Sequence, residues 1–261
     1  MITLLYALLC ILLAAACFFT WRNRNHSKRR KAVLSASALL LIAAFCFVWL
    51  SDFYPADPES GRYLVSAGGV TVERSVNGWR FDGPGEAAAL IFYPGAKVEA
   101  AAYAPLLFSL AAGGVDAFLV QMPFRLAVLD QRAAERLIGT YPYRRWILAG
   151  HSLGGAMASG YAAAHADTVW GLVLLAAYPT EKLDDSQAFL SVYGDRDGVL
   201  NFERYESSRA CWPRNAQELV IPGGNHAQFG NYGPQSGDGE AAISRAEQQK
   251  LTVDAILRWV G

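Results

Sequence analysis

The chain of 261 residues carries 23 basic and 23 acidic side chains, so its formal net charge at pH 7 is zero. Residues 1–51 contain six basic residues and no acidic one, which leaves 17 basic and 23 acidic residues, a net charge of −6, for residues 52–261. A mildly acidic globular part has no electrostatic footprint for nucleic acid, so we expect no nucleic-acid binding. Of the four cysteines only Cys211 lies outside the apolar N-terminal segments, which excludes a disulfide framework and a cysteine zinc site.

Two long uncharged segments, residues 1–21 and 32–50, begin the chain. At about 1.5 Å per residue, each is long enough to cross a hydrocarbon core of about 30 Å. All six basic residues lie between them, in residues 22–31, and positively charged loops stay on the cytoplasmic side. The sequence therefore predicts a transmembrane helical hairpin over residues 1–51 in a bacterial cytoplasmic membrane, with the following domain on the extracytoplasmic side.

Two processing events are alternatives to the first transmembrane helix. Residues 1–21 resemble a cleaved signal peptide in their apolar character, and Cys17 follows a short alanine run as in a lipoprotein site. Both alternatives lack the basic segment that precedes the apolar run in such leaders. Residues 52–60, with Pro55 and Pro58 among polar residues, are predicted to be a linker to a globular domain over residues 61–261.

From residue 61 onward, short apolar β-branched runs alternate with alanine-rich helical runs. This alternation is typical of an α/β fold in which helices cover both faces of a mostly parallel sheet. The eight predicted strands are residues 63–66, 70–75, 88–93, 115–121, 145–149, 169–176, 188–193 and 218–221. The predicted helices are residues 98–112, 130–139, 153–165, 201–210 and 244–260.

The segment Gly-His-Ser-Leu-Gly at residues 150–154 follows a predicted strand and begins a predicted helix. That is the context of a nucleophile elbow, in which a strained turn exposes a serine and small neighbours let strand and helix approach. Ser152 would stand at the N-terminus of the helix, where free N–H groups favour developing negative charge. The alternative is a glycine-rich turn with an incidental serine.

A serine hydroxyl needs a base, and the chain has four histidines. His26 lies in the basic loop, His151 is the immediate neighbour of the serine, and His165 ends the helix far from it. His226 remains, in a glycine-containing loop after the last predicted strand, at the carboxyl edge of the sheet where ligands of open α/β sheets bind. We therefore predict His226 to be the base, with His151 packing against the elbow and His165 interacting with the helix C-terminus.

The imidazole needs an acid that fixes its tautomer. Asp197 follows the preceding strand and is the predicted acid, whereas Asp195 in the same turn is better explained as a turn-former that binds backbone N–H groups. Glu181, after another strand, is a third candidate. With Asp197, the order along the chain is serine, aspartate, histidine.

The oxyanion of the reaction needs preorganised N–H donors. The sequence predicts the N–H of Leu153, next to the nucleophile, and that of Ala96, in the loop after the strand at residues 88–93, although Pro94-Gly95 also suits an ordinary loop. Phe124, Phe229 and Tyr232 are candidates for the wall of an acyl pocket. Core aromatic residues would follow the same pattern.

These motifs resemble the alpha/beta-hydrolase superfamily in its dienelactone-hydrolase-like and esterase branches. The matching segments are residues 150–155, 194–197 and 225–226, in the right order across residues 61–261. Two departures are Pro94-Gly95, where many members have His-Gly, and Ser152 in place of the cysteine of dienelactone hydrolase, so the substrate of that enzyme does not carry over. Residues 226–233 also resemble an uncharacterised membrane-anchored subgroup.

The motifs and the resemblance together predict a serine hydrolase of an alpha/beta-hydrolase fold, with a mostly parallel eight-stranded sheet. The predicted reaction is cleavage of a small-molecule carboxylic ester, with thioester, amide and lipid-derived substrates as variants, through an acyl-serine intermediate. No metal or organic cofactor is expected. The competing hypothesis is a catalytically silent fold that serves as a membrane-tethered binding module.

Overall fold

The computed structural model describes residues 11–261 except residues 13, 20, 23–26 and 86–87. The chain divides into two compact units, Met1–Phe53 and Tyr54–Gly261. In the first unit, helix α2 (Lys28–Ser51) is capped at its N-terminus by Ser27, whose side chain accepts a hydrogen bond from the Arg30 N–H. The helix therefore starts four residues earlier than predicted, because a capping serine precedes its basic first turn.

Helix α2 has no buried residue in this structure, and its most apolar stretch has a mean hydropathy of 2.5. Among the described residues it is the one helix long and apolar enough to cross a membrane, where the sequence predicts two. The first half of the other predicted span, residues 1–10, lies outside the described residues. The described residues in the remainder of that span, residues 11, 12, 14–19 and 21, are helical.

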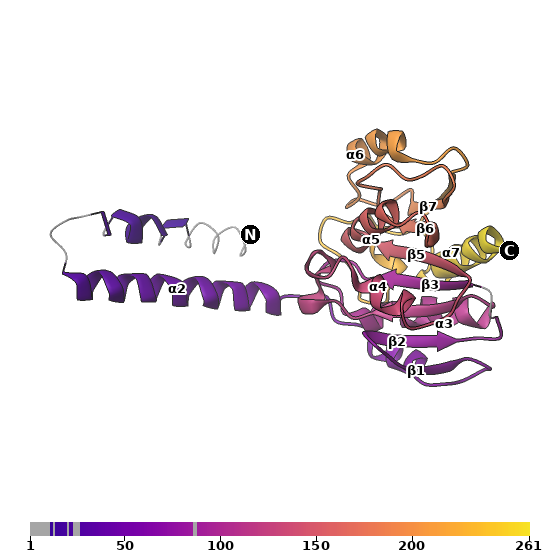
Figure 1. Cartoon of the computed structure of the whole chain (residues 1–261), viewed down its shortest axis with the longest axis horizontal. Helices are drawn as coiled ribbons and strands as arrows, with labels where there is room; N and C mark the ends of the chain where they lie inside the picture. Colours follow the sequence, from indigo (N-terminus) through magenta and orange to yellow (C-terminus); the bar gives the residue numbers. More distant parts are fainter. Residues whose placement is uncertain (1–10, 13, 20, 23–26, 86–87) are drawn as a thin grey trace. The chain divides into compact units, whose positions relative to one another are not determined.

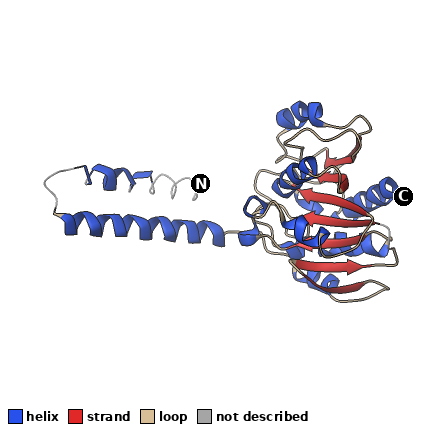
Figure 2. Ribbon diagram, in the orientation of Figure 1, coloured by secondary structure: helices blue, strands red, loops and turns tan. Residues whose placement is uncertain are grey.

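The second unit is built on one eight-stranded sheet with the order β1-β2-β4-β3-β5-β6-β7-β8 (Figures 1 and 2). Strands β3 to β8 run parallel, whereas β2 is antiparallel to both β1 and β4. The strands are β1 (Thr71–Ser75), β2 (Gly78–Asp82), β3 (Ala88–Tyr93), β4 (Asp116–Val120), β5 (Arg145–His151), β6 (Val169–Leu175), β7 (Ala188–Gly194) and β8 (Gln217–Ile221).

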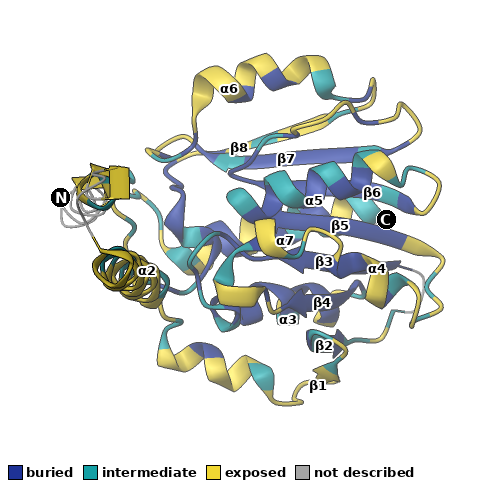
Figure 3. Ribbon diagram, turned by 60° about the vertical axis from the view of Figure 1, so that its left-hand side comes forward, coloured by how far each residue is buried: buried dark blue, intermediate teal, exposed yellow. Residues whose placement is uncertain are grey.

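The central strands are buried on both faces, as Figure 3 shows for β3 and β5. Successive residues of β3 alternate between two hydrophobic clusters, with Leu90 and Phe92 in one and Ile91 in the other, as the period of two requires. The helices that contribute to the first cluster are α3 (Ala104–Ala112) and α7 (Arg245–Val260), and those that contribute to the second are α4 (Ala133–Ile138) and α5 (Leu153–Ala164). The expected α/β architecture is confirmed.

Short elements complete the unit. Helix α6 (Phe202–Ser207) follows β7, and its N-cap Asn201 accepts from the Arg204 N–H. The 3-10 helices are η1 (Pro58–Leu64), η2 (Ala100–Tyr103), η3 (Pro123–Arg125), η4 (Ala127–Leu129), η5 (Ser208–Cys211) and η6 (Ala227–Phe229).

Two predictions about the first strands are wrong. Residues 63–66 do not form a strand, because Pro58 initiates the 3-10 helix η1, which takes up Tyr63 and Leu64. Strand β2 was missed, because its glycine and charged residues interrupt the apolar pattern. The dipeptide Asn77-Gly78 at the tip of the β1–β2 hairpin is the signal that reveals it.

The segment predicted to be a linker is folded onto the second unit from Tyr54 onward. The Tyr54 N–H donates to the Lys97 carbonyl (2.7 Å), and the Tyr54 carbonyl accepts from the Glu99 N–H (2.9 Å). The Glu99 carboxylate in turn accepts from the Ala56 N–H (3.0 Å). Only residues 52 and 53 therefore separate the end of α2 from a backbone segment fixed in the second unit.

Candidate active site

Ser152 occupies the turn between β5 and α5 with φ 52° and ψ −127°, a conformation that non-glycine residues rarely adopt. The turn needs glycine on both sides of Ser152, because the chain approaches itself closely there. A Cβ atom on Gly150 would lie 2.6 Å from the Gly155 nitrogen, and one on Gly154 would lie 2.2 Å from the Pro94 carbonyl oxygen. The local geometry is that of a nucleophile elbow.

His226, at the beginning of η6, is buried and contacts an aspartate through its side chain. Its Nδ1 lies 2.9 Å from Oδ2 of Asp197, which is also buried. The other oxygen of Asp197 accepts from the N–H groups of Val199 and Leu200, each at 2.8 Å. A carboxylate held by two backbone donors leaves Oδ2 to accept from the ring, so Nδ1 carries the proton.

Asp195 has a different partner. Its Oδ1 accepts from the Gly223 N–H at 2.7 Å, which joins the turn after β7 to the loop after β8. Of the two aspartates that the sequence offers, the structure brings Asp197 to His226 and places Asp195 in the turn.

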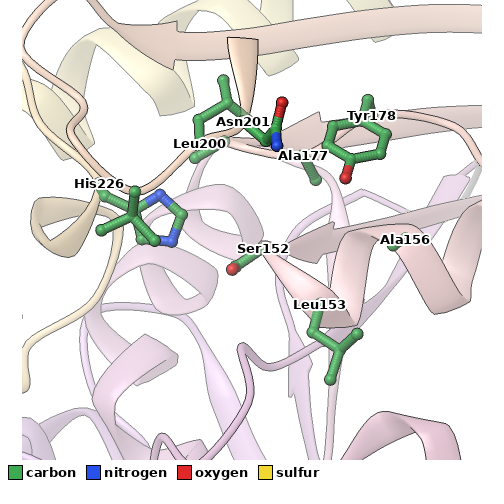
Figure 4. Close-up of a pocket in the computed structure, with 10 residues that line it drawn as sticks. Ser152, Leu153, Ala156, Ala177, Tyr178, Leu200, Asn201 and His226 are labelled. Carbon is green, nitrogen blue, oxygen red and sulfur yellow. The ribbon is translucent and has the colours of Figure 1, made fainter. Parts of the chain in front are cut away.

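The Nε2 atom of His226 is buried and has no hydrogen-bond partner among the described residues. Figure 4 shows His226 and Ser152 on the same cavity, with the Ser152 hydroxyl turned toward the side on which the ring lies. The cavity has a volume of about 200 Å³. An imidazole with a protonated Nδ1 has its acceptor lone pair on Nε2, which suits a base that faces the cavity.

Sequence reasoning missed part of the cavity wall. Tyr178, which follows β6, and Leu200 and Asn201, which follow Asp197, line the cavity together with Ser152 and Leu153 (Figure 4). Each comes shortly after a parallel strand that ends at the carboxyl edge of the sheet, and that position is the signal that could have identified them.

The two predicted oxyanion donors lie in different surroundings. Leu153 is the first residue of α5 and lines the cavity, and a first-turn N–H has no acceptor within its own helix. Ala96 follows β3 in a half-buried loop and does not line the cavity. The preceding Gly95 N–H donates to the Tyr103 hydroxyl at 3.1 Å. No hydrogen bond of the Ala96 N–H is found among the described residues.

His151 forms a fixed support behind His226. Its Nδ1 lies 2.8 Å from the Tyr103 hydroxyl, and its Nε2 lies 3.1 Å from the His226 carbonyl oxygen. Burial, and secondarily the neighbouring His226, lowers the pKa of His151 well below 6.5. His151 is therefore neutral and donates from Nε2 to the backbone of His226, whereas the sequence predicts that it packs against the elbow.

The aromatic residues proposed for the acyl pocket do not line the cavity. Phe229 and Tyr232 are buried in the core, with ring centroids 5.7 and 6.4 Å from that of His151. Phe124 lies on the loop after β4 and is exposed. Sequence position put these residues near the carboxyl edge but did not reveal which way each ring points. His165 stacks on Tyr161 and binds its carbonyl oxygen at the C-terminus of α5, as expected.

Asp238 links the loops that carry Asp197 and His226, and sequence reasoning missed it. One of its oxygens accepts from the N–H groups of Gly198 (3.1 Å), His226 (3.1 Å) and Gly239 (2.9 Å). The other accepts from the Ala227 N–H at 2.8 Å. A single carboxylate thus fixes the backbone on both sides of the Asp197–His226 contact.

Residues 89–250 match the sequence model of the Alpha/beta hydrolase family. The chain belongs to that family. No protein of curated function is significantly similar to this alpha/beta hydrolase in sequence. Its expected membership of the superfamily is confirmed, whereas the matching model does not distinguish a branch.

Solved structures have the same fold at low sequence identity. A serine hydrolase involved in carbazole degradation, the CarC enzyme, has a TM-score of 0.54 and 14% identity, over 73% of this chain and 98% of that one. The carboxylesterase CesB from Bacillus subtilis gives 0.52 and 10%, over 77% and 94%. A monoacylglycerol lipase from Paleococcus ferrophilus gives 0.53 and 14%, over 72% and 99%.

Proposed function

We propose that this alpha/beta hydrolase is a serine hydrolase that cleaves a carboxylic ester, or a related acyl bond, through an acyl-serine intermediate. The observation that carries the proposal is the buried contact between Nδ1 of His226 and Asp197. The Nε2 atom of the same ring has no hydrogen-bond partner in the described part of the chain, and His226 lies on the cavity that also holds Ser152. In this proposal Ser152 is the nucleophile, His226 the general base and Asp197 the acid that orients it.

The reaction has two halves. The Ser152 oxygen forms a bond to the carbonyl carbon while Nε2 of His226 takes the hydroxyl proton. The negative charge on the carbonyl oxygen is stabilised by the N–H group of Leu153, and the second proposed donor is the N–H of Ala96, whose loop approaches the elbow at Gly154. Collapse of this intermediate breaks the bond to the alcohol, which leaves with the proton from His226. Water then attacks the acyl-serine by the same route, so an acid is released and Ser152 is restored.

The acyl group of the substrate is of modest size. Ligand cavities commonly measure about 300–1,000 Å³, and the cavity beside Ser152, at about 200 Å³, is smaller. Tyr178 and Asn201 are polar groups on its wall that can position the alcohol or the acyl part. The names of the carboxylesterase and the lipase with the same fold agree with an ester substrate but do not select one.

We also propose that α2 anchors the hydrolase in a bacterial cytoplasmic membrane, with the catalytic unit outside the cytoplasm. The 24 residues of α2 span about 36 Å, and its first four residues are basic while its C-terminal end leads to Tyr54. A signal sequence is the alternative for an apolar helix near the N-terminus. Protease added to intact spheroplasts should digest the catalytic unit, and digestion only after lysis would contradict the proposed orientation.

The catalytic proposal is tested with the full chain in detergent and a fluorophosphonate probe, which reacts with activated serines. The wild-type protein should be labelled, and Ser152→Ala should not. A fluorogenic ester should be hydrolysed by the wild type alone. Equal labelling of the two proteins would exclude the serine hydrolase and favour the competing hypothesis, a membrane-tethered binding module with the same fold.

A further inference from the structure

Several apolar side chains in the loop between β4 and α4 are exposed to solvent. Within residues 123–129, which form the two consecutive 3-10 helices η3 and η4, Pro123, Phe124, Val128 and Leu129 are exposed. Phe124 alone exposes 62% of its surface. These four residues are called the loop patch. Scattered apolar residues are normal on a protein surface, whereas a cluster in one loop indicates an interaction surface.

The backbone of the loop that carries the loop patch is strained at Phe124 and Arg125. Phe124 and Arg125 have φ angles of 49° and 60°, so two consecutive bulky residues adopt the left-handed conformation that favours glycine. The Arg125 N–H donates to the Met122 carbonyl, and the Leu126 N–H donates to the Pro123 carbonyl, each at 3.0 Å. Strain of this kind persists where the surroundings enforce it, and it is typical of functional segments.

The loop patch lies at the same edge of the sheet as Ser152. Strand β4 is next to β3, and β3 is next to β5, so the loops that follow these parallel strands are neighbours at the carboxyl edge. The Arg125 carbonyl accepts from the Lys97 N–H at 2.9 Å, which joins the loop of residues 123–129 to the loop of Pro94 to Ala96. The Lys97 carbonyl accepts from the Tyr54 N–H, so the chain enters the second unit at this edge as well.

The covalent chain limits how far this edge can lie from the end of α2. Only residues 52 and 53 lie between Ser51, the last residue of α2, and Tyr54. Three extended residues span about 10 Å, and apolar groups at a membrane surface enter the interface by about 5–10 Å. If α2 crosses the membrane, the short connection between Ser51 and Tyr54 therefore keeps the carboxyl edge of the sheet within reach of the lipid surface.

We propose that the loop patch inserts into the lipid surface of the membrane, so that the Ser152 cavity receives amphiphilic esters directly from lipid. This inference rests on the proposed anchoring of α2 by the membrane, and it adds a second, separate lipid contact. A soluble protein partner or a second copy would bury the same side chains, but neither is kept close by the short connection between Ser51 and Tyr54.

The experiment uses the full chain in lipid nanodiscs, with the native cysteines replaced by serine and one cysteine introduced as Phe124→Cys. The matched control is Val65→Cys, because Val65 is 63% exposed. The control lies toward the opposite edge of the sheet. Its neighbour Ser66 accepts from the Val72 N–H, and Val72 pairs with Phe81, which in turn pairs with Ala117 near the start of β4. Leu129→Cys is a second patch position, in case the first variant does not fold.

Each cysteine carries a bimane fluorophore, and the nanodiscs contain either phosphatidylcholine or its brominated analogue, which quenches fluorophores in contact with lipid. We expect loss of fluorescence at position 124 or 129 and none at position 65. This readout needs no catalysis, so it stands or falls separately from the hydrolase activity. Unquenched patch labels in a protein that is retained in the nanodiscs would overturn the inference, and failure of the protein to enter nanodiscs would overturn it together with the anchoring.

One further outcome identifies another occupant, and a kinetic measurement tests the lipid contact. Cross-linking of Phe124→Cys chains to each other without lipid quenching would assign the loop patch to a second copy, and would also overturn the inference. In the kinetic counterpart, Leu129→Ser should lower hydrolysis of a butyrate ester of a long-chain alcohol, held in the bilayer, by about tenfold, because one leucine side chain no longer enters the apolar phase. Hydrolysis of a soluble acetyl ester, and both activities of Val65→Ser, should be unchanged.

Discussion

The exchange Asp197→Asn tests the assignment of the acid, because asparagine has the same shape but only one acceptor oxygen. In the wild-type structure Asp197 uses one oxygen for the N–H groups of Val199 and Leu200 and the other for Nδ1 of His226. The asparagine oxygen can serve the two backbone groups or the ring, but not both. If it stays with the two backbone donors, its NH₂ group faces Nδ1, which must then accept a hydrogen bond.

That rearrangement moves the imidazole proton to Nε2, so His226 can no longer take the proton of Ser152. Loss of the correct tautomer costs about 10⁴-fold in turnover in comparable triads, which corresponds to about 5 kcal/mol of barrier. Because the pair is buried, the variant should also lose about 1–3 kcal/mol of folding stability from imperfect hydrogen bonds. The catalytic loss should therefore exceed what unfolding explains.

The matched control is Asp195→Asn, since Asp195 accepts one hydrogen bond, from the Gly223 N–H, and an asparagine oxygen can still accept it. We expect this variant to keep its activity within about threefold, the scale of a small surface change. The measurements are the turnover of a p-nitrophenyl butyrate solution, the rate constant of fluorophosphonate labelling, and the melting temperature. Equal losses in the two variants, or a folded Asp197→Asn with near wild-type labelling, would refute the assignment.

Three other changes test the surroundings of the site. Gly154→Ala should abolish labelling, because its Cβ would lie 2.2 Å from a carbonyl oxygen. Its control in the same helix, Gly160→Ala, meets nothing closer than 3.7 Å and should stabilise the fold by about 0.5–1 kcal/mol. Intact activity of Gly154→Ala would contradict the close approach. Burial lowers the pKa of His151 in the folded state, so below about pH 6.5 the unfolded chain binds this proton more tightly than the folded one. The free energy of unfolding should therefore fall as the pH falls, by up to about 1.4 kcal/mol per pH unit. Melting curves of wild type and His151→Gln should differ in this acidic slope, and identical slopes would show that His151 does not cause it. Asp238→Asn turns the amide NH₂ group toward the Ala227 N–H, so that two donors face each other. On protein that remains folded, turnover should fall about tenfold with little change in KM. A lower melting temperature with normal turnover would limit Asp238 to a structural role.

The parallel strands and the elbow could be predicted because each is encoded locally. Strand β5 is a continuous apolar run, and the glycines around Ser152 follow from the tight turn that an exposed nucleophile needs. The edge strand β2 has neither property. Its pairing is fixed by the hairpin at Asn77-Gly78 and by β4, which is distant in sequence, so a local pattern could not reveal it.

The direction of side chains and the partners of loops are set by long-range packing. The sequence placed Phe229 and Tyr232 beside the candidate base, but both rings pack against His151, and Tyr232 also packs against Tyr103, which comes from an earlier part of the chain. Asp238 likewise acquires its role only when the loops of Gly198 and His226 meet. A flanking glycine on each side was its one local signal, and such triplets occur in many turns.

The orientation of His226 depends on more than its aspartate partner. Its N–H donates to Asp238, its carbonyl accepts from His151, and its Nδ1 contacts Asp197, so backbone and ring are fixed by three side chains from different parts of the chain. Nε2, which has no hydrogen-bond partner among the residues that the structure describes, is then left on the cavity of Ser152. Because the three contacts restrain one residue, their losses should not be additive. Once Asp197→Asn has removed the correct tautomer, Asp238→Asn should cost turnover little more, and a fully additive double variant would show that the two carboxylates act independently.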